Sequence, residues 1–173
     1  MAILTPENVN FLSPVGFQLR LSRAPEMTYY LTATRIPSVS LIDVDGIETP
    51  FVKMPVPGTK LEFEGVNFTF MVDEDMKNYL ELFNWMVSLG FPESFDQATG
   101  WSPPTPGGDD GYLTDGTLTI LTSAMTPNIT VTYRDMIISQ LSDIEFDSKV
   151  SDIDHATCTV TFKIRGYVIS QLS

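Results

Sequence analysis

The sequence contains a single cysteine, Cys158, and a single histidine, His155. One cysteine excludes an intrachain disulfide, so the chain does not read as a disulfide-stapled secreted scaffold. A structural zinc site needs four nitrogen or sulfur ligands, which these two residues do not supply. The sequence therefore predicts neither a bound metal nor any other cofactor.

Basic residues are also scarce: ten Lys and Arg stand against 22 Asp and Glu, a formal net charge of −12. Proteins that hold nucleic acid through its phosphates need a basic patch, so that class is disfavoured. No apolar run approaches the roughly 20 residues that span a bilayer. The N-terminus lacks the basic and apolar regions of a signal peptide. We therefore expect a protein kept in a cytosol-like compartment, with no membrane partner.

The composition is that of a globular domain, with 43% hydrophobic and 18% charged residues in a chain of 173. Period-two alternation of apolar and polar residues dominates, which is typical of half-buried β-strands. It predicts strands over residues 17–21, 27–34 (paired with the first as a hairpin), 39–44, 47–57, 61–72, 117–121, 129–134, 136–146 and 156–167.

The segment 39–58 has the features of a hairpin that projects from the body. Asp45-Gly46 is a strong signal for a hairpin turn. The returning strand contains three prolines, which are poorly tolerated in a central strand, so the hairpin should lie at an edge or reach a neighbour. The residues expected to make its contacts are Val39, Leu41, Ile42, Val44, Asp45, Gly46, Phe51, Val52, Met54 and Pro55.

One helix is predicted, over about residues 74–89, with Asp73-Glu74-Asp75 as its N-terminal cap. Its apolar residues recur at helical spacing and should form the stripe that faces the core: Met76, Tyr79, Leu80, Phe83, Met86 and Val87. The predicted fold class is mainly β, a β-sandwich or barrel of about eight strands with one flanking helix.

The chain divides into an N-terminal arm, residues 1–15, and a single domain, residues 16–173. Within the domain, residues 92–116 form a long loop rich in Pro, Gly and Asp, a kind of loop that is usually functional or exposed. Its Trp101 and Tyr112 could pack on the body or meet a partner. Its aspartates, from Asp109 to Asp115, leave open a site for a hard cation.

Residues with catalytic chemistry are few. Asp154 and His155 precede Cys158 by three to four residues, and nucleophilic catalysis needs a base within hydrogen-bond reach of the nucleophile. Cys158, however, falls on the apolar face of a strand, where a free cysteine usually acts as a small hydrophobe. The sequence has no phosphate-binding loop and no nucleophile elbow. We therefore expect no enzymatic activity, with a hydrolase based on His155 and Cys158 as the alternative.

The order of the segments carries a family resemblance over about residues 16–169. The strand Phe17-Gln18-Leu19-Arg20-Leu21 is followed by the strand end at residues 33–37 and by the projecting hairpin. Residues 68–74 then lead into the helix, and residues 141–147 precede a final strand at 159–164. This order resembles the tail tube proteins of contractile-tailed bacteriophages, which are related to the tube proteins of type VI secretion and other contractile injection systems.

The resemblance implies a structural virion protein. Six copies would close into a ring, and rings would stack through the hairpin into a hollow, acidic, hydroxyl-rich channel that DNA crosses without specific binding. The implied partners are further copies of the chain, the tail sheath, and baseplate or neck proteins. Assembly would occur in the host cytoplasm, and the product would be the virion tail. Two alternatives stay open: an initiator or terminator ring of the same fold, and a monomeric β-sandwich binding module that uses Trp101 and Tyr112.

Overall fold

The computed structural model describes the following residues: 10–21, 23–42, 44–48, 51, 53–56, 58–90, 93, 113–146 and 155–172. For 44–48 and 53–56 the description is that of the backbone. This part of the chain is mainly β, as the sequence predicts, with eleven strands and two helices. None of its helices is long and apolar enough to cross a bilayer.

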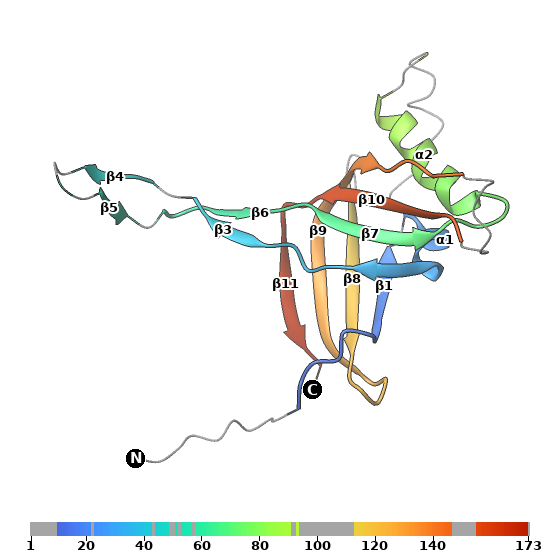
Figure 1. Ribbon diagram of the computed structural model, residues 1–173, viewed down its shortest axis with the longest axis horizontal. Coiled ribbons are helices and arrows are strands. Elements are labelled where there is room, and N and C mark those ends of the chain that lie inside the picture. The colour runs from blue at the N-terminus through green and yellow to red at the C-terminus, as the bar shows by residue number, and fades with distance from the viewer. Residues whose placement is uncertain are drawn as a thin grey trace, which may run out of the picture.

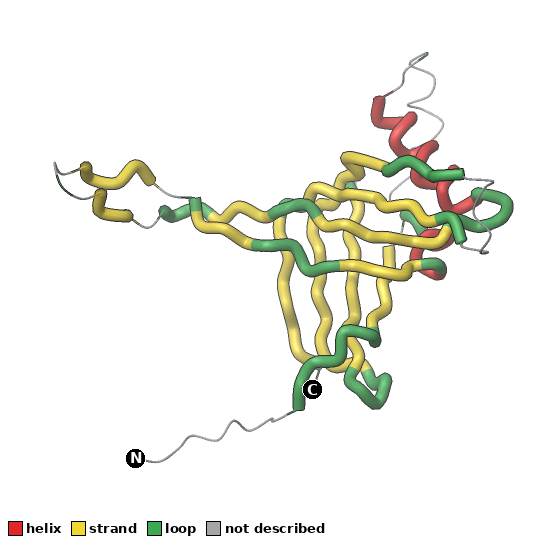
Figure 2. Tube along the Cα trace, viewed as in Figure 1, coloured by secondary structure: helices red, strands yellow, loops and turns green. Residues whose placement is uncertain are grey.

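Seven strands form the body: β1 (Phe17–Leu21), β2 (Leu31–Thr34), β7 (Val66–Met71), β8 (Thr114–Leu121), β9 (Pro127–Leu141), β10 (Thr157–Lys163) and β11 (Gly166–Gln171). The long strand β9 belongs to two antiparallel layers. Its first half pairs with β8 and β11, giving the order β1-β8-β9-β11, and its second half pairs with β10 in the order β9-β10-β7-β2. Figures 1 and 2 show the second layer crossing over the first, so the body is a sandwich with open edges.

The core lies between the two layers, where alternate side chains of each strand point inward. In β7, Val66, Phe68 and Phe70 are fully buried, and the residues between them are half-buried. The Phe68 ring lies 6.2 Å from the Tyr133 ring of β9 and 5.7 Å from the Phe162 ring of β10. The edge-on contact with Tyr133 joins the two layers, whereas the tilted contact with Phe162 lies within one layer.

The sequence-based assignment of residues 27–34 as one strand is wrong in its first half. Residues Pro25–Tyr29 form a short helix, α1, and only Leu31–Thr34 is strand. Pro25 occupies the first turn of α1, where its missing N–H costs nothing, and the Met27 side chain is buried. The strand that follows pairs with β7 and not with the first strand, β1, whose partner is β8.

Two further strand boundaries differ from the prediction. The separate strands expected at 129–134 and 136–146 are the single strand β9, which bends at Asp135, a residue with a φ of 51°. The strand expected at 156–167 is two strands, β10 and β11, joined by a tight turn at Ile164 and Arg165. Alternation alone does not reveal a bend or a two-residue turn, because it continues on either side of both.

The second helix, α2 (Lys77–Gly90), lies where a helix is predicted, but the predicted buried face is wrong. Leu80 and Phe83 are each 46% exposed, whereas Tyr79 and Met86 lie only at the flank of the core. The residues that α2 buries are Asn78, Leu82, Trp85 and Ser88.

Specific contacts fix this orientation of α2. The Trp85 ring lies 5.6 Å from Phe162 and stacks under the Arg23 guanidinium at 4.9 Å. The Asn78 side chain donates to the Met71 carbonyl at 2.8 Å and accepts from the Asp73 N–H at 3.2 Å, which ties the helix to the end of β7. The acidic triplet 73–75 precedes the helix in a turn and places no acid in its first turn, so it is not the predicted cap.

Helix α2 also contributes Glu81, whose carboxylate is directed at α1. Burial raises the pKa of Glu81, the repulsion of Glu26 adds to this, and backbone N–H groups at the start of α1 oppose it. A carboxyl pKa that is higher in the folded state than in the unfolded chain means that the ionised group costs stability. This cost is absent below the unfolded pKa of about 4.3 and develops as the pH rises through the folded value.

We therefore expect Glu81→Gln to stabilise the fold at pH 7.5 and to have little effect near pH 4. The amide keeps the shape and one acceptor oxygen, replaces the other oxygen by an NH2 group and removes the charge. Thermal unfolding of both chains across this pH range measures the difference. Glu74→Gln, at an exposed position in the preceding turn, is the control. A difference in stability between the two chains that does not change with pH would contradict a raised pKa of Glu81 in the folded state.

Candidate assembly surfaces

A long hairpin extends away from the body over residues 39–63, and we call it the projecting hairpin (Figure 1). Its inner part pairs β3 (Val39–Leu41) with β6 (Leu61–Phe63), and the Ile42 N–H continues the ladder to the Lys60 carbonyl at 2.9 Å. Its outer part pairs β4 (Val44–Glu48) with β5 (Lys53–Val56). The predicted turn at Asp45-Gly46 is wrong: these residues lie inside β4, where the register shifts as in a β-bulge, a role that glycine also favours.

The inner part of the projecting hairpin has one apolar and one polar face. Val39 is opposite Phe63 and Leu41 is opposite Leu61, so these four side chains share a face. Ser40 and Glu62 form the other face. Leu61 is 60% exposed, Leu41 is 45% exposed and Val39 is 42% exposed. A two-stranded ribbon buries little by itself. Phe63 is half-buried against Tyr167, whereas the other three side chains of this face are exposed among the described residues.

The residues predicted to make the hairpin's contacts lie along its whole length. Val39, Leu41, Ile42 and Phe51 are exposed. Val44, Asp45 and Gly46 are in β4, and Met54 and Pro55 are in β5. Val52 lies outside the described residues. Their role in contacts between copies stays a prediction.

The root of the projecting hairpin is anchored by Tyr167 of β11. The Tyr167 ring packs edge-on against Phe63 at 5.4 Å, and its hydroxyl donates to the Pro37 carbonyl at 3.2 Å. One side chain thus holds both strands of the hairpin where they leave the body. The Phe63 ring also lies against Gly166, 3.4 Å from the position that a Cβ would take, which is ordinary van der Waals contact.

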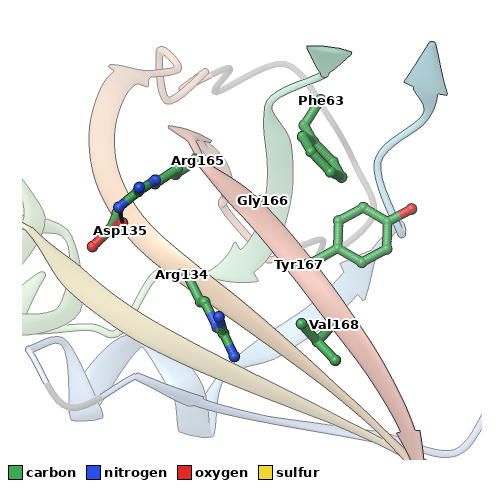
Figure 3. Close-up of a pocket in the computed structure, with 7 residues that line it drawn as sticks. All are labelled: Phe63, Arg134, Asp135, Arg165, Gly166, Tyr167 and Val168. Carbon is green, nitrogen blue, oxygen red and sulfur yellow. Dashed lines mark hydrogen bonds and ion pairs between the residues drawn. The ribbon is translucent and has the colours of Figure 1, made fainter. Parts of the chain in front are cut away.

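A hollow of about 340 Å³ lies beside this anchor (Figure 3). The Gly166 backbone forms its floor, with Phe63 on one side and the Arg165 side chain on the other. The Arg165 guanidinium contacts the Asp135 carboxylate at 3.1 Å, and this pair is largely open to solvent. Arg134 extends from β9 below them, and no hydrogen bond or ion pair of its side chain occurs within the described part of the chain.

The structure describes two of the residues considered for catalysis, Cys158 and His155. Cys158 is buried, and burial raises the pKa of its thiol, although contacts with Ser142 partly oppose this. A thiol with a raised pKa is a poor nucleophile at neutral pH. His155 is exposed, and Asp154 lies outside the described residues. The Cys158 contacts that the structure gives are hydrogen bonds with Ser142 and with the Thr159 carbonyl.

The loop predicted over residues 92–116 lies mostly outside the described residues, including Trp101, Asp109, Asp110 and Tyr112. Asp115 is described, at the start of β8, where its carboxylate accepts the Asp135 N–H at 3.0 Å. No group of three potential metal ligands occurs in the part of the chain that is described.

Solved structures with this arrangement come from contractile injection systems. A chain of the extended sheath–tube complex of the PVC extracellular contractile injection system superposes with a TM-score of 0.61 at 13% identity, covering 95% of this chain and 94% of its own. A chain of the anti-feeding prophage cap, a tube-terminating cap, gives 0.62 at 12%, covering 99% and 100%. Hcp1 from Flavobacterium johnsoniae gives 0.50 at 10%, covering 91% and 98%. The chain has the tube-protein fold.

At such low sequence identities, the similarity to these structures shows a shared fold and nothing more. No protein-family model matches the sequence, and no curated protein matches it. The tube-protein fold in this chain leaves two strands of one layer, β1 and β11, paired on one side only. On β11, Val168 and Ile169 are about half exposed, so this edge is partly apolar.

The outer face of that layer is rich in hydroxyl groups. Register places two polar rows across it: Gln18, Thr119, Thr130 and Ser170 in one, and Arg20, Thr117, Thr132 and Val168 in the next. The seven body strands together carry only five charged side chains: Arg20, Asp115, Arg134, Asp135 and Lys163. The large negative charge of the chain therefore resides in its loops, its helices and the projecting hairpin.

The root of the projecting hairpin was not predicted from the sequence. In the sequence, Phe63 and Tyr167 have the pattern of ordinary strand residues. Arg134 and Arg165 occupy polar positions of alternating strands. The available signal was Arg165-Gly166, a charged residue and a glycine that interrupt the alternation of the last strand. Treated as a turn, it would have placed Gly166 and Tyr167 at the start of a separate strand.

Proposed function

We propose that the chain is a structural, non-enzymatic subunit of the tube of a contractile tail or injection system, and that its copies form rings that stack into a hollow tube. The observation that carries the proposal is the projecting hairpin on a tube-protein fold, because its apolar side chains Val39, Leu41 and Leu61 are exposed in the part of the chain that the structure describes. A soluble chain with such a face needs a partner to bury it.

Ring closure would use the two free strands of one layer. Unpaired strand edges are liable to pair with other chains, and proteins protect or use them. Pairing of β1 of one copy with β11 of the next would be a head-to-tail contact, which closes into a ring when the rotation permits. By the resemblance of the sequence to phage tail tubes, we propose six copies in each ring.

The channel would be lined by the outer face of the same layer. Threonine, serine and glutamine dominate this face, and its charges are Arg20, Arg134 and Asp115. We therefore propose a hydroxyl-rich channel with few charges, not the acidic one that the family resemblance implies. DNA would pass because a face with so few cations cannot neutralise many phosphates.

The proposed partners are further copies of the chain, a sheath around the tube, and baseplate or neck proteins at its ends. A chain of similar fold comes from a sheath–tube complex, and another comes from an anti-feeding prophage baseplate, at a TM-score of 0.58 and 9% identity. For a bacteriophage, the location would be the virion tail, assembled in the host cytoplasm.

A second candidate is a ring that ends the tube. It is favoured by the likeness to the anti-feeding prophage cap, which extends over the whole of that chain. A terminator would form rings that do not stack on one another, so the length of the assembly separates the two roles.

Negative-stain electron microscopy of the purified protein, with light scattering on the same sample, tests the proposal. We expect rings with a central hole, and tubes as the concentration rises. Single rings at every concentration would assign the terminator role. A 19.3 kDa monomer at every concentration would contradict both roles and favour a monomeric binding module.

A further inference from the structure

We infer that the apolar face of the projecting hairpin packs on the outward face of α2 in a second copy of the chain. This inference rests on the proposed function, because it names the surface that receives the hairpin. We define the α2 outward face by Leu80, Phe83 and Val87.

The first argument is the reversed amphipathicity of α2. Helical spacing puts Leu80, Phe83 and Val87 on one side, and Asn78, Leu82, Trp85 and Ser88 on the other. The structure buries the second set, which contains two polar residues, and leaves Leu80 and Phe83 exposed. The Tyr79 ring stacks on Phe83 at 6.3 Å and widens the apolar surface. An apolar stripe that points away from its own core indicates a partner.

The second argument is position. The projecting hairpin and α2 lie at opposite ends of the long axis of the molecule (Figure 1). A surface at one end and its complement at the other make a head-to-tail contact, the kind that builds rings and open stacks instead of closed pairs. Both surfaces are exposed and apolar, and neither can reach the other within one chain.

The third argument is charge. Three basic residues, Arg35, Arg134 and Arg165, lie at the root of the projecting hairpin, and Lys60 lies further out, opposite Ile42. The described acids near them are Glu62, Glu64 and Asp135, of which Asp135 is paired with Arg165. The start of α2 is acidic: Glu26, Asp73, Glu74, Asp75 and Glu81 outnumber Lys77 and Arg23, and Lys77 is already paired with Asp75 at 2.7 Å. Opposite charges beside two apolar faces favour one orientation of the contact.

The test uses two double variants, each defective in one half of the contact. Leu41→Asp with Leu61→Asp damages the hairpin face, and Leu80→Asp with Phe83→Asp damages the α2 outward face. All four residues are exposed, so each variant should keep its circular dichroism spectrum. Each should need at least about a hundredfold higher concentration to assemble, since charges buried against an apolar face are costly.

Mixing the two variants gives the decisive result. The first variant keeps an intact α2 face and the second an intact hairpin, so one contact can still form between them. We expect assemblies of two units and no more, whether the unit is a ring or a single subunit. Mass photometry and electron microscopy count the units. Each variant is the control for the other, because it retains the half that its partner lacks.

The outcomes separate this inference from the proposed function. If the wild-type chain assembles and the Leu80→Asp, Phe83→Asp variant assembles equally well, the hairpin has another receiver, such as the β11 edge, and the inference is overturned while the proposed function stands. A mixture that stays unassembled likewise overturns it. A wild-type chain that never assembles contradicts both.

Discussion

Placing Asp at both Leu41 and Leu61 is expected to abolish tube formation while the subunit stays folded. The two residues face each other across β3 and β6, and both are exposed, so the substitutions remove no contact of the core. In an assembled tube they would bring two unpaired carboxylates into an apolar contact, at a cost of about 3 kcal/mol or more. Electron microscopy should show no tubes at concentrations where the wild-type chain forms them.

The opposite face of the same hairpin supplies the matched control. Ser40 lies between Val39 and Leu41 but points to the other side, opposite Glu62. Ser40→Asp adds one carboxylate, half the charge of the double variant, within one residue of the damaged position, and it should leave tube formation unchanged. Equal loss of tubes in both variants would show that charge on the hairpin matters and that the apolar face does not.

The strands of the body were largely predictable because their pattern has a single physical cause. Residues 66–71 alternate between full and partial burial, and Gly65 before them interrupts the pattern where a Cβ would lie only 3.0 Å from the Phe162 carbonyl oxygen. Alternation of this kind indicates that one face of the strand is buried, and it does so in any strand order. It does not report the partner of a strand, which is why β2 was assigned to β1 when it pairs with β7.

The orientation of α2 could not be predicted from periodicity, for a related reason. An apolar stripe shows that one side of a helix is covered, but not whether the cover is its own core or another chain. Burial of Asn78 is possible only because the Met71 carbonyl and the Asp73 N–H satisfy its amide, and these contacts depend on the fold. The same ambiguity applies to the hairpin root, where Phe63 and Tyr167 meet across more than 100 residues of sequence.

Trp85→Ala should be among the most damaging single substitutions in α2, and Phe83→Ala, two residues earlier, should be mild. Trp85 is 1% exposed and joins the helix to Phe162 of β10 and to Arg23. Truncating a buried aromatic side chain costs about 3–5 kcal/mol, a large share of the roughly 5–15 kcal/mol that stabilises a typical domain. Phe83 is nearly half exposed, and its loss should cost about 1 kcal/mol or less.

Denaturant unfolding gives the free energy of unfolding of the two variants. The protein concentration should be too low for assembly, because association would stabilise the folded chain and hide the difference in stability between the variants. The comparison also decides how the helix is oriented. If the sequence-predicted stripe faced the core, Phe83→Ala would be the damaging variant and Trp85→Ala the mild one. The structure requires the reverse order. Because we infer that Phe83 contacts a second copy of the chain, Phe83→Ala should weaken assembly far more than it weakens folding.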